Sequence, residues 1–110
     1  FLFIDDCLKG TFDLFKSDFH EPLNIGSEEQ VSINQMISII EEIASYKVEK
    51  NYQLDKPLGV RGRSSDNKLV SQKLDWSPKL NLKQGLELTY SWIHDQMNSG
   101  SNIDKFTRSY

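Results

Sequence analysis

Residues 23–36, Leu-Asn-Ile-Gly-Ser-Glu-Glu-Gln-Val-Ser-Ile-Asn-Gln-Met, combine a predicted strand, a turn and the start of a helix. Residues 23–26 form a short apolar run that ends in glycine, which is typical of a strand followed by a turn. Ser32 and Gln35 have the spacing of a capping box, in which each side chain accepts a hydrogen bond from the other residue's backbone amide. The apolar positions of the following helix are Met36, Ile39, Ile40 and Ile43.

The segments on either side continue this alternation of strand and helix. Residues 1–4 are apolar and predict a further strand, and residues 7–17 predict a helix with one apolar face. Residues 48–54 alternate weakly, which favours a strand. Residues 67–74 and 82–97 predict two more helices. The expected inward positions of the last helix are Leu86, Trp92 and Ile93. Alternating strands and helices predict an α/β fold with parallel strands.

Several single residues are expected to fix these elements. Gly10 weakens its helix relative to alanine, and we expect it to be there because a neighbour packs closely. Asp66 is the predicted N-cap of the short helix. Asn81 and Gln84 form a second capping-box pattern at the start of the last helix. Trp76 lies in the connection between the two helices and is expected to anchor it.

The composition excludes several classes of protein. The chain has 110 residues, the size of one domain, and a formal net charge of −3 from 13 basic and 16 acidic residues. This charge disfavours nucleic-acid binding. One cysteine excludes an internal disulfide, and no apolar run is long enough to span a bilayer. We therefore expect a cytoplasmic chain without nucleic-acid or membrane partners. Because it opens on Phe-Leu-Phe-Ile without an initiator Met, we also expect further chain upstream.

The residues that most often carry catalysis are scattered in this sequence. His20 and His94 lie far apart without nearby metal-ligand spacing, so both are interpreted as exposed polar residues. Cys7 is interpreted as a small core residue. Asp5 and Asp6 are adjacent and would point apart at the end of a strand, which favours capping over acid/base chemistry. The sequence therefore predicts no catalytic residue and no metal site.

One segment has the composition of an anion site. Residues 60–66, Val-Arg-Gly-Arg-Ser-Ser-Asp, bring together two arginines, a glycine and two hydroxyls before a helix start. The planar guanidinium of Arg61 or Arg63 can donate two parallel hydrogen bonds to phosphate oxygens. Gly62 permits a sharp turn or close approach to a ligand, and amides at a helix start add positive potential. The alternative is a solvated basic loop in which Arg61 pairs with an acid.

Taken together, these motifs resemble those of the GDP-mannose 3,5-epimerase family, within the extended short-chain dehydrogenase/reductase superfamily. The matching segments are FIDDC (3–7), SDFHEP (17–22), LNIGS (23–27), VRGRSSDN (60–67) and LDWSP (74–78). The VRGRSSDN and SDFHEP strings are the specific ones. Ser64 stands where the family has Asn, and Asp75 where it has Gly. The resemblance runs from residue 1 to about residue 97.

The resemblance implies that this chain is the C-terminal portion of a Rossmann-type enzyme, with most of a substrate-binding domain in residues 1–97 and a flexible tail in 98–110. It implies a nucleotide-sugar epimerase that uses NAD for transient oxidation, with the NAD loop and catalytic Tyr and Lys upstream. Arg63 matches the family's contact to the substrate diphosphate, Arg61 is a supporting contact, and Ser109 is the nearest match to a substrate-contacting serine in the tail.

The resemblance also implies a GDP-sugar substrate and a homodimer for the complete enzyme, and an inactive piece when these 110 residues stand alone. Two alternatives stay open. One keeps the superfamily and changes the reaction to that of another NAD-dependent nucleotide-sugar epimerase, dehydratase or decarboxylase. The other is a non-catalytic homologue that only binds a nucleotide sugar.

Overall fold

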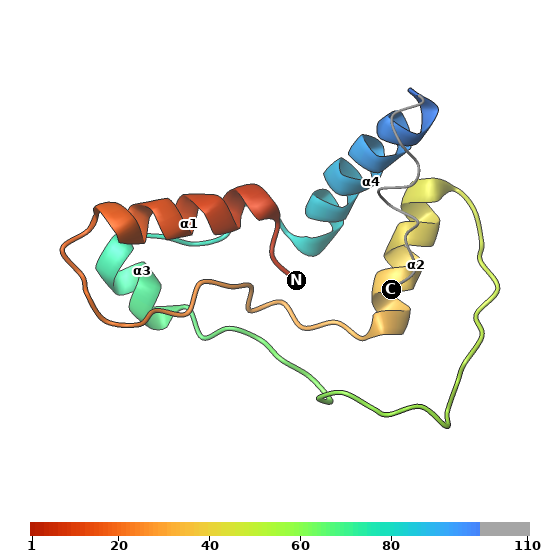
Figure 1. Ribbon diagram of the computed structural model, residues 1–110, viewed down its shortest axis with the longest axis horizontal. Coiled ribbons are helices and arrows are strands. Elements are labelled where there is room, and N and C mark those ends of the chain that lie inside the picture. Colours follow the sequence, from red (N-terminus) through yellow and green to blue (C-terminus); the bar gives the residue numbers. More distant parts are fainter. Residues whose placement is uncertain (100–110) are drawn as a thin grey trace.

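The computed structural model describes residues 1–99 and contains four helices (Figure 1). They are α1 (Ile4–Lys16), α2 (Ile33–Ala44), α3 (Lys68–Leu74) and α4 (Leu82–Asn98). In Figure 1, α3 lies below one end of α1, α2 and α4 lie at the opposite side, and the segment between α2 and α3 sweeps around the open edge. The radius of gyration is 17.1 Å, against about 13 Å for a compact domain of this length. The fold is therefore open.

The strands predicted at residues 1–4, 23–26 and 48–54 are not formed within residues 1–99. A strand requires a neighbour to hydrogen-bond with along its edge, and these segments run singly. The N-terminal segment instead leads into α1. Phe3 is extended and is the N-cap of this helix, which begins at Ile4. The sheet part of the α/β expectation is thus unconfirmed, whereas the four helices are confirmed.

The helix starts follow the predicted capping chemistry. At α2, Ser32 N–H donates to Gln35 Oε1 at 2.7 Å and Gln35 N–H donates to Ser32 Oγ at 3.1 Å. Asn81 and Gln84 form the same reciprocal pair at α4, at 3.1 and 2.9 Å. Each box satisfies two backbone donors that a helix end otherwise leaves free. Both predicted capping boxes are confirmed.

The N-cap predicted for α3 was one residue too early. The structure places Asn67 at this position, and Asp66 lies outside the helix. Asp66 still serves the helix start, because its Oδ1 accepts a hydrogen bond from Lys68 N–H at 3.0 Å. The carboxylate does this as an Asx-type contact, two residues along the chain.

A small apolar core forms where α1 meets the connection between α3 and α4, while α2 packs against α4. The buried apolar residues among those described are Val70, Trp76 and Leu82. A Cβ built on Gly10 would lie 2.8 Å from Ile25 Cγ2 and 2.9 Å from the Trp76 indole. Both the anchoring role of Trp76 and the close approach expected at Gly10 are confirmed.

Much apolar surface stays open around this core. The apolar face of α1 is exposed, with Phe15 82% and Leu8 59% accessible. Leu86 and Ile93 of α4 are half-buried, but Trp92 is 55% exposed, so its predicted inward position was wrong. Trp92 instead lines an apolar groove of about 610 Å³ with residues 1–4. Within residues 1–99, no helix has the length and apolar character needed to cross a bilayer.

Candidate functional site

The arginine-containing segment lines a shallow polar groove. Arg63, Ser64 and Ser65 form one wall, and the segment 23–27 and residues 1–2 form the other, around a volume of about 520 Å³. The Arg63 side chain is exposed, and no acidic group among residues 1–99 pairs with it. A guanidinium that lines a groove without an acidic partner has its donors available for an anionic ligand.

Four polar contacts hold this wall of the groove in place. Ser65 N–H donates to the Ser27 carbonyl at 3.0 Å, and the Asn67 side-chain amide donates to the Gly26 carbonyl at 2.8 Å. Ser65 Oγ donates to Asn67 Oδ1 at 2.7 Å, and Asn67 N–H donates to Glu28 Oε1 at 3.2 Å. The arginine segment is therefore tied to the turn that follows residues 23–26.

Gly26 makes this close approach possible. A Cβ built on Gly26 would lie 2.6 Å from Ser65 Cβ, well inside van der Waals contact. The glycine that ends the predicted strand thus serves to let the serine of the arginine segment pack against its backbone.

The start of α3 contributes less positive potential than its sequence suggests. Glu28 accepts the amide of Asn67, and Asp66 accepts the amide of Lys68. These carboxylates satisfy two of the amide donors at the helix start and offset part of the positive field there. Arg63 lines the groove, whereas Asn67 and Lys68 do not, so we expect the helix amides to contribute less to anion binding than the sequence indicates.

Arg61 and Asp66, the other predicted site residues that the structure describes, do not line the groove. Arg61 is exposed, forms no ion pair within residues 1–99 and is not among the residues that line the groove. Asp66 caps α3 and does not form an ion pair with an arginine there. Ser109 lies outside the described residues. The structure therefore brings Arg63 to the groove and leaves Arg61 beside it.

The remaining reactive side chains do not form a site in the part of the chain that the structure describes. His94 stacks on Tyr90 at a centroid distance of 6.2 Å and contacts Asn98 on the same helix. His20 is exposed, and Cys7 is half-buried, so the interpretation of Cys7 as a core residue is only partly correct. No group of three metal-ligating residues occurs within residues 1–99.

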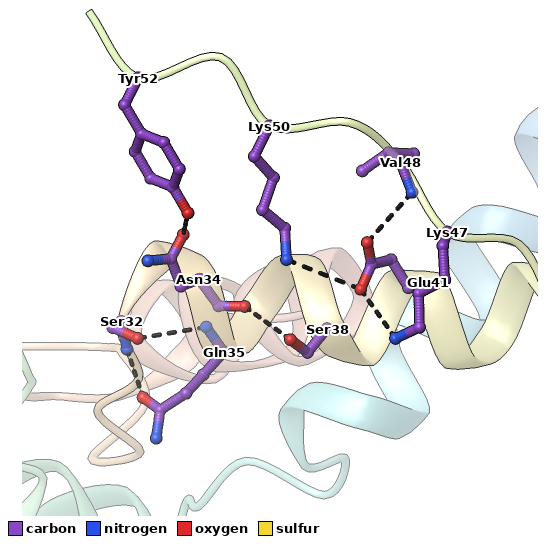
Figure 2. A network of polar contacts seen from close by, with 9 residues as sticks. All are labelled: Ser32, Asn34, Gln35, Ser38, Glu41, Lys47, Val48, Lys50 and Tyr52. Atoms are coloured by element: carbon purple, nitrogen blue, oxygen red, sulfur yellow. Dashed lines mark hydrogen bonds and ion pairs between the residues drawn. The ribbon is translucent and has the colours of Figure 1, made fainter.

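The segment that leads toward the arginines is anchored on α2 by one carboxylate (Figure 2). Glu41 is 5% exposed and accepts hydrogen bonds from Val48 N–H at 3.1 Å and Lys47 Nζ at 3.0 Å, with Lys50 Nζ at 3.7 Å. The Val48 amide and then the two ammonium groups lower the pKa of Glu41, because each interaction favours the ionised carboxylate.

Sequence reasoning missed Glu28, Asn67 and Ser65 as parts of the site frame. Residues 27–30, Ser-Glu-Glu-Gln, have the composition of an ordinary polar turn, and nothing local indicates that Glu28 reaches a residue 39 positions away. The available signal was Asn67, a polar residue at the start of a short helix directly after the arginine segment.

The class of protein follows from comparison with solved structures. The UDP-glucuronic acid 4-epimerase from Bacillus cereus, solved with UDP-glucuronic acid and NAD, matches with a TM-score of 0.78 and 34% identity. The match covers 86% of this chain and 31% of that one. The chain is therefore similar to part of an extended short-chain dehydrogenase/reductase fold. No protein-family model matches the chain.

Sequence comparison shows which members of this superfamily the chain resembles more strongly. The chain is 43% identical to the GDP-mannose 3,5-epimerase of Arabidopsis thaliana over 99% of its own length. It is 48% identical to GDP-mannose 3,5-epimerase 1 of Oryza sativa subsp. indica over 88% of its length. The chain spans 25–30% of the length of these relatives. The resemblance to the GDP-mannose 3,5-epimerase family is thereby confirmed.

Proposed function

We propose that this chain supplies the diphosphate-binding part of a nucleotide-sugar epimerase that converts GDP-mannose to GDP-L-galactose. The observation that carries the proposal is the placement of Arg63, whose exposed guanidinium lines the groove without an acidic partner among residues 1–99. Identity of 43–48% to proteins named for this activity supports the choice of substrate.

Arg63 binds and orients the substrate in this proposal. Two N–H donors of its guanidinium hold oxygens of the two linked phosphoryl groups, which fixes the nucleotide end and leaves the hexose free to extend toward the reacting groups. Arg61, at the exposed side of the same segment, adds positive charge and a secondary contact. Ser109 is the proposed contact from the tail.

The residues described here do not fit an NAD site. Residues 1–99 contain no glycine-rich turn of the kind that receives a dinucleotide. The Tyr-x-x-x-Lys spacing occurs at Tyr46/Lys50 and Tyr52/Lys56, but residues 46–56 lie outside the helices, and the two lysines face Glu41 at 3.7 Å and Asp55 at 3.4 Å. NAD would supply transient oxidation of the sugar, and we place it and the catalytic residues in a part of the protein outside these 110 residues. In the same proposal the complete enzyme is a cytoplasmic homodimer, and the 110 residues alone are inactive.

The test is turnover by the protein as it occurs, together with any chain that precedes or follows these residues. We expect conversion of GDP-mannose, and a fall in kcat/KM of roughly 10- to 150-fold in Arg63→Ala, which is the value of a charge-assisted hydrogen bond. Lys56→Ala is the matched control, because Lys56 is an exposed cation paired with Asp55 at 3.4 Å. No turnover of GDP-mannose by the wild type would refute the proposal.

A second candidate is a 4-epimerase that acts on a UDP-sugar, because the solved structure with a TM-score of 0.78 is a UDP-glucuronic acid 4-epimerase. Its 34% identity is lower than the 43–48% found for the GDP-mannose enzymes. Offering GDP-mannose and UDP-glucuronic acid side by side separates the two candidates, and we expect preference for the GDP-sugar. Binding of either nucleotide sugar without turnover would instead indicate a non-catalytic homologue.

A further inference from the structure

We propose that Asn67 is a positioning residue that places Arg63 in the groove by tying the arginine segment to the Gly26–Ser27 turn. The inference rests on the proposed function of Arg63. It gives a role to Asn67, which the arginine segment and its chemistry did not assign. Asn67 does not line the groove that Arg63 lines, so its effect on a ligand there must pass through the segment it holds.

Burial and hydrogen bonding mark Asn67 as the centre of this attachment. It is 6% exposed, and both ends of its side-chain amide are used, by donation to the Gly26 carbonyl at 2.8 Å and acceptance from Ser65 Oγ at 2.7 Å. A buried amide that loses a partner leaves an unsatisfied group, which is more costly than the hydrogen bond itself. The geometry is therefore strongly specified.

The contacts join segments that are distant in sequence. Residues 26 and 67 are 41 positions apart, and the intervening chain includes an exposed stretch over residues 51–64. Because that stretch has little packing of its own, the attachment at residues 65–67 fixes where Arg63 lies relative to the turn. The Ser65 N–H bond to Ser27 adds a second tie within two residues of the arginine.

The first variant is Asn67→Asp, which has nearly the same shape as the wild type. Its carboxylate keeps an acceptor for Ser65 Oγ but loses the donor to the Gly26 carbonyl. We expect GDP affinity to fall about tenfold, the value of one hydrogen bond lost at a buried group. Ser65→Ala removes the other side-chain contact without adding a charge and should weaken GDP binding in the same direction.

The matched control is Asn34→Asp. Asn34 lies at the start of α2 and its Oδ1 accepts the Tyr52 hydroxyl at 3.2 Å (Figure 2). The substitution adds the same negative charge and keeps that acceptor, at a position that does not line the groove. GDP affinity should be unchanged in this control.

A double-mutant cycle separates positioning from a general structural effect. If Asn67 acts through Arg63, then Asn67→Asp has almost no further effect on GDP affinity once Arg63 is alanine. A purely structural or electrostatic effect of the new carboxylate would persist in the Arg63→Ala background, and an additive cycle would overturn the proposal.

Hydrogen exchange at the Ser65 amide gives a readout that does not depend on ligand. In Asn67→Asp this amide should exchange faster, because its bond to Ser27 opens more often. Unchanged exchange would overturn the positioning role. If the wild type fails to bind GDP, the proposed function fails instead, and exchange at Ser65 still decides whether Asn67 holds the arginine segment.

Discussion

Gly10 illustrates at the residue scale how one missing side chain allows helix, turn and core to meet. Its backbone faces Ile25 and the Trp76 indole at distances that no Cβ tolerates. We expect Gly10→Ala to lower the free energy of unfolding by about 1–3 kcal/mol, although alanine is the better helix former by about 1 kcal/mol. Gly59→Ala is the control, since a Cβ there meets nothing within 4 Å. Equal urea midpoints for the two variants would contradict the close packing.

Asp75 is held in a left-handed conformation, with φ of 51°, at the end of α3. Glycine adopts this conformation without the steric cost that a Cβ imposes, and the epimerase motif has glycine here. Asp75→Gly should therefore raise the free energy of unfolding by roughly 0.5–1 kcal/mol. Asp75→Ala should give no such gain, because alanine keeps the Cβ. Denaturant unfolding of the two variants measures the difference, and a gain from alanine would show that φ is not the cause.

At the scale of elements, the attachment of residues 47–50 to α2 depends on the charge of Glu41. The folded chain lowers the pKa of Glu41 below its usual 4.5, so this stabilisation is present above about pH 4.5 and is lost as the pH falls through the folded value. We expect the protection factor of the Val48 amide to drop on acidification below about pH 4.5. In Glu41→Gln the protection should be weaker at neutral pH and nearly independent of pH. An acid-insensitive Val48 amide in the wild type would contradict the account.

The elements also show what local sequence can predict. Both capping boxes and all four helices follow from neighbouring residues, because a cap and an amphipathic stripe are satisfied within a few positions. Strands are different, since their backbone groups require a partner from elsewhere in the chain. The segment 23–26 has the composition of a strand, yet within residues 1–99 its Gly26 carbonyl accepts the Asn67 side chain. The backbone bond to the arginine segment, from Ser65 N–H, is accepted by Ser27, one residue beyond this segment.

In the candidate site, too, local features could be predicted from the sequence and long-range contacts could not. The composition of residues 60–66 indicated an anion site at Arg61 or Arg63, with a solvated loop as the alternative, and the family resemblance singled out Arg63. It was not sufficient to predict that Glu28 accepts the Asn67 amide at the start of α3, because this contact spans 39 positions. Long-range polar contacts of this kind leave no periodic pattern in the sequence.

At the scale of the whole molecule, apolar surface outweighs the buried core. Residues 1–99 bury Val70, Trp76 and Leu82, whereas the apolar face of α1 and the groove between residues 1–4 and α4 stay open. Exposed apolar patches of this kind favour association. The isolated 110-residue chain should therefore melt broadly or associate, which size-exclusion chromatography with light scattering and a thermal melt would detect. A monomer with a sharp transition would contradict this prediction.

The central claim is that Arg63 holds the diphosphate of a GDP-sugar. The most direct measurement is the ratio of the dissociation constants for guanosine and GDP, obtained by titration calorimetry on the protein as it occurs and on Arg63→Ala. The wild type should bind GDP much more tightly than guanosine. In Arg63→Ala the affinity for GDP should fall roughly 10- to 150-fold while the affinity for guanosine stays the same, so the ratio should fall by the same factor. Arg63→Lys should restore only part of it, because the ammonium lacks the planar pair of donors. An unchanged ratio in Arg63→Ala would contradict the account.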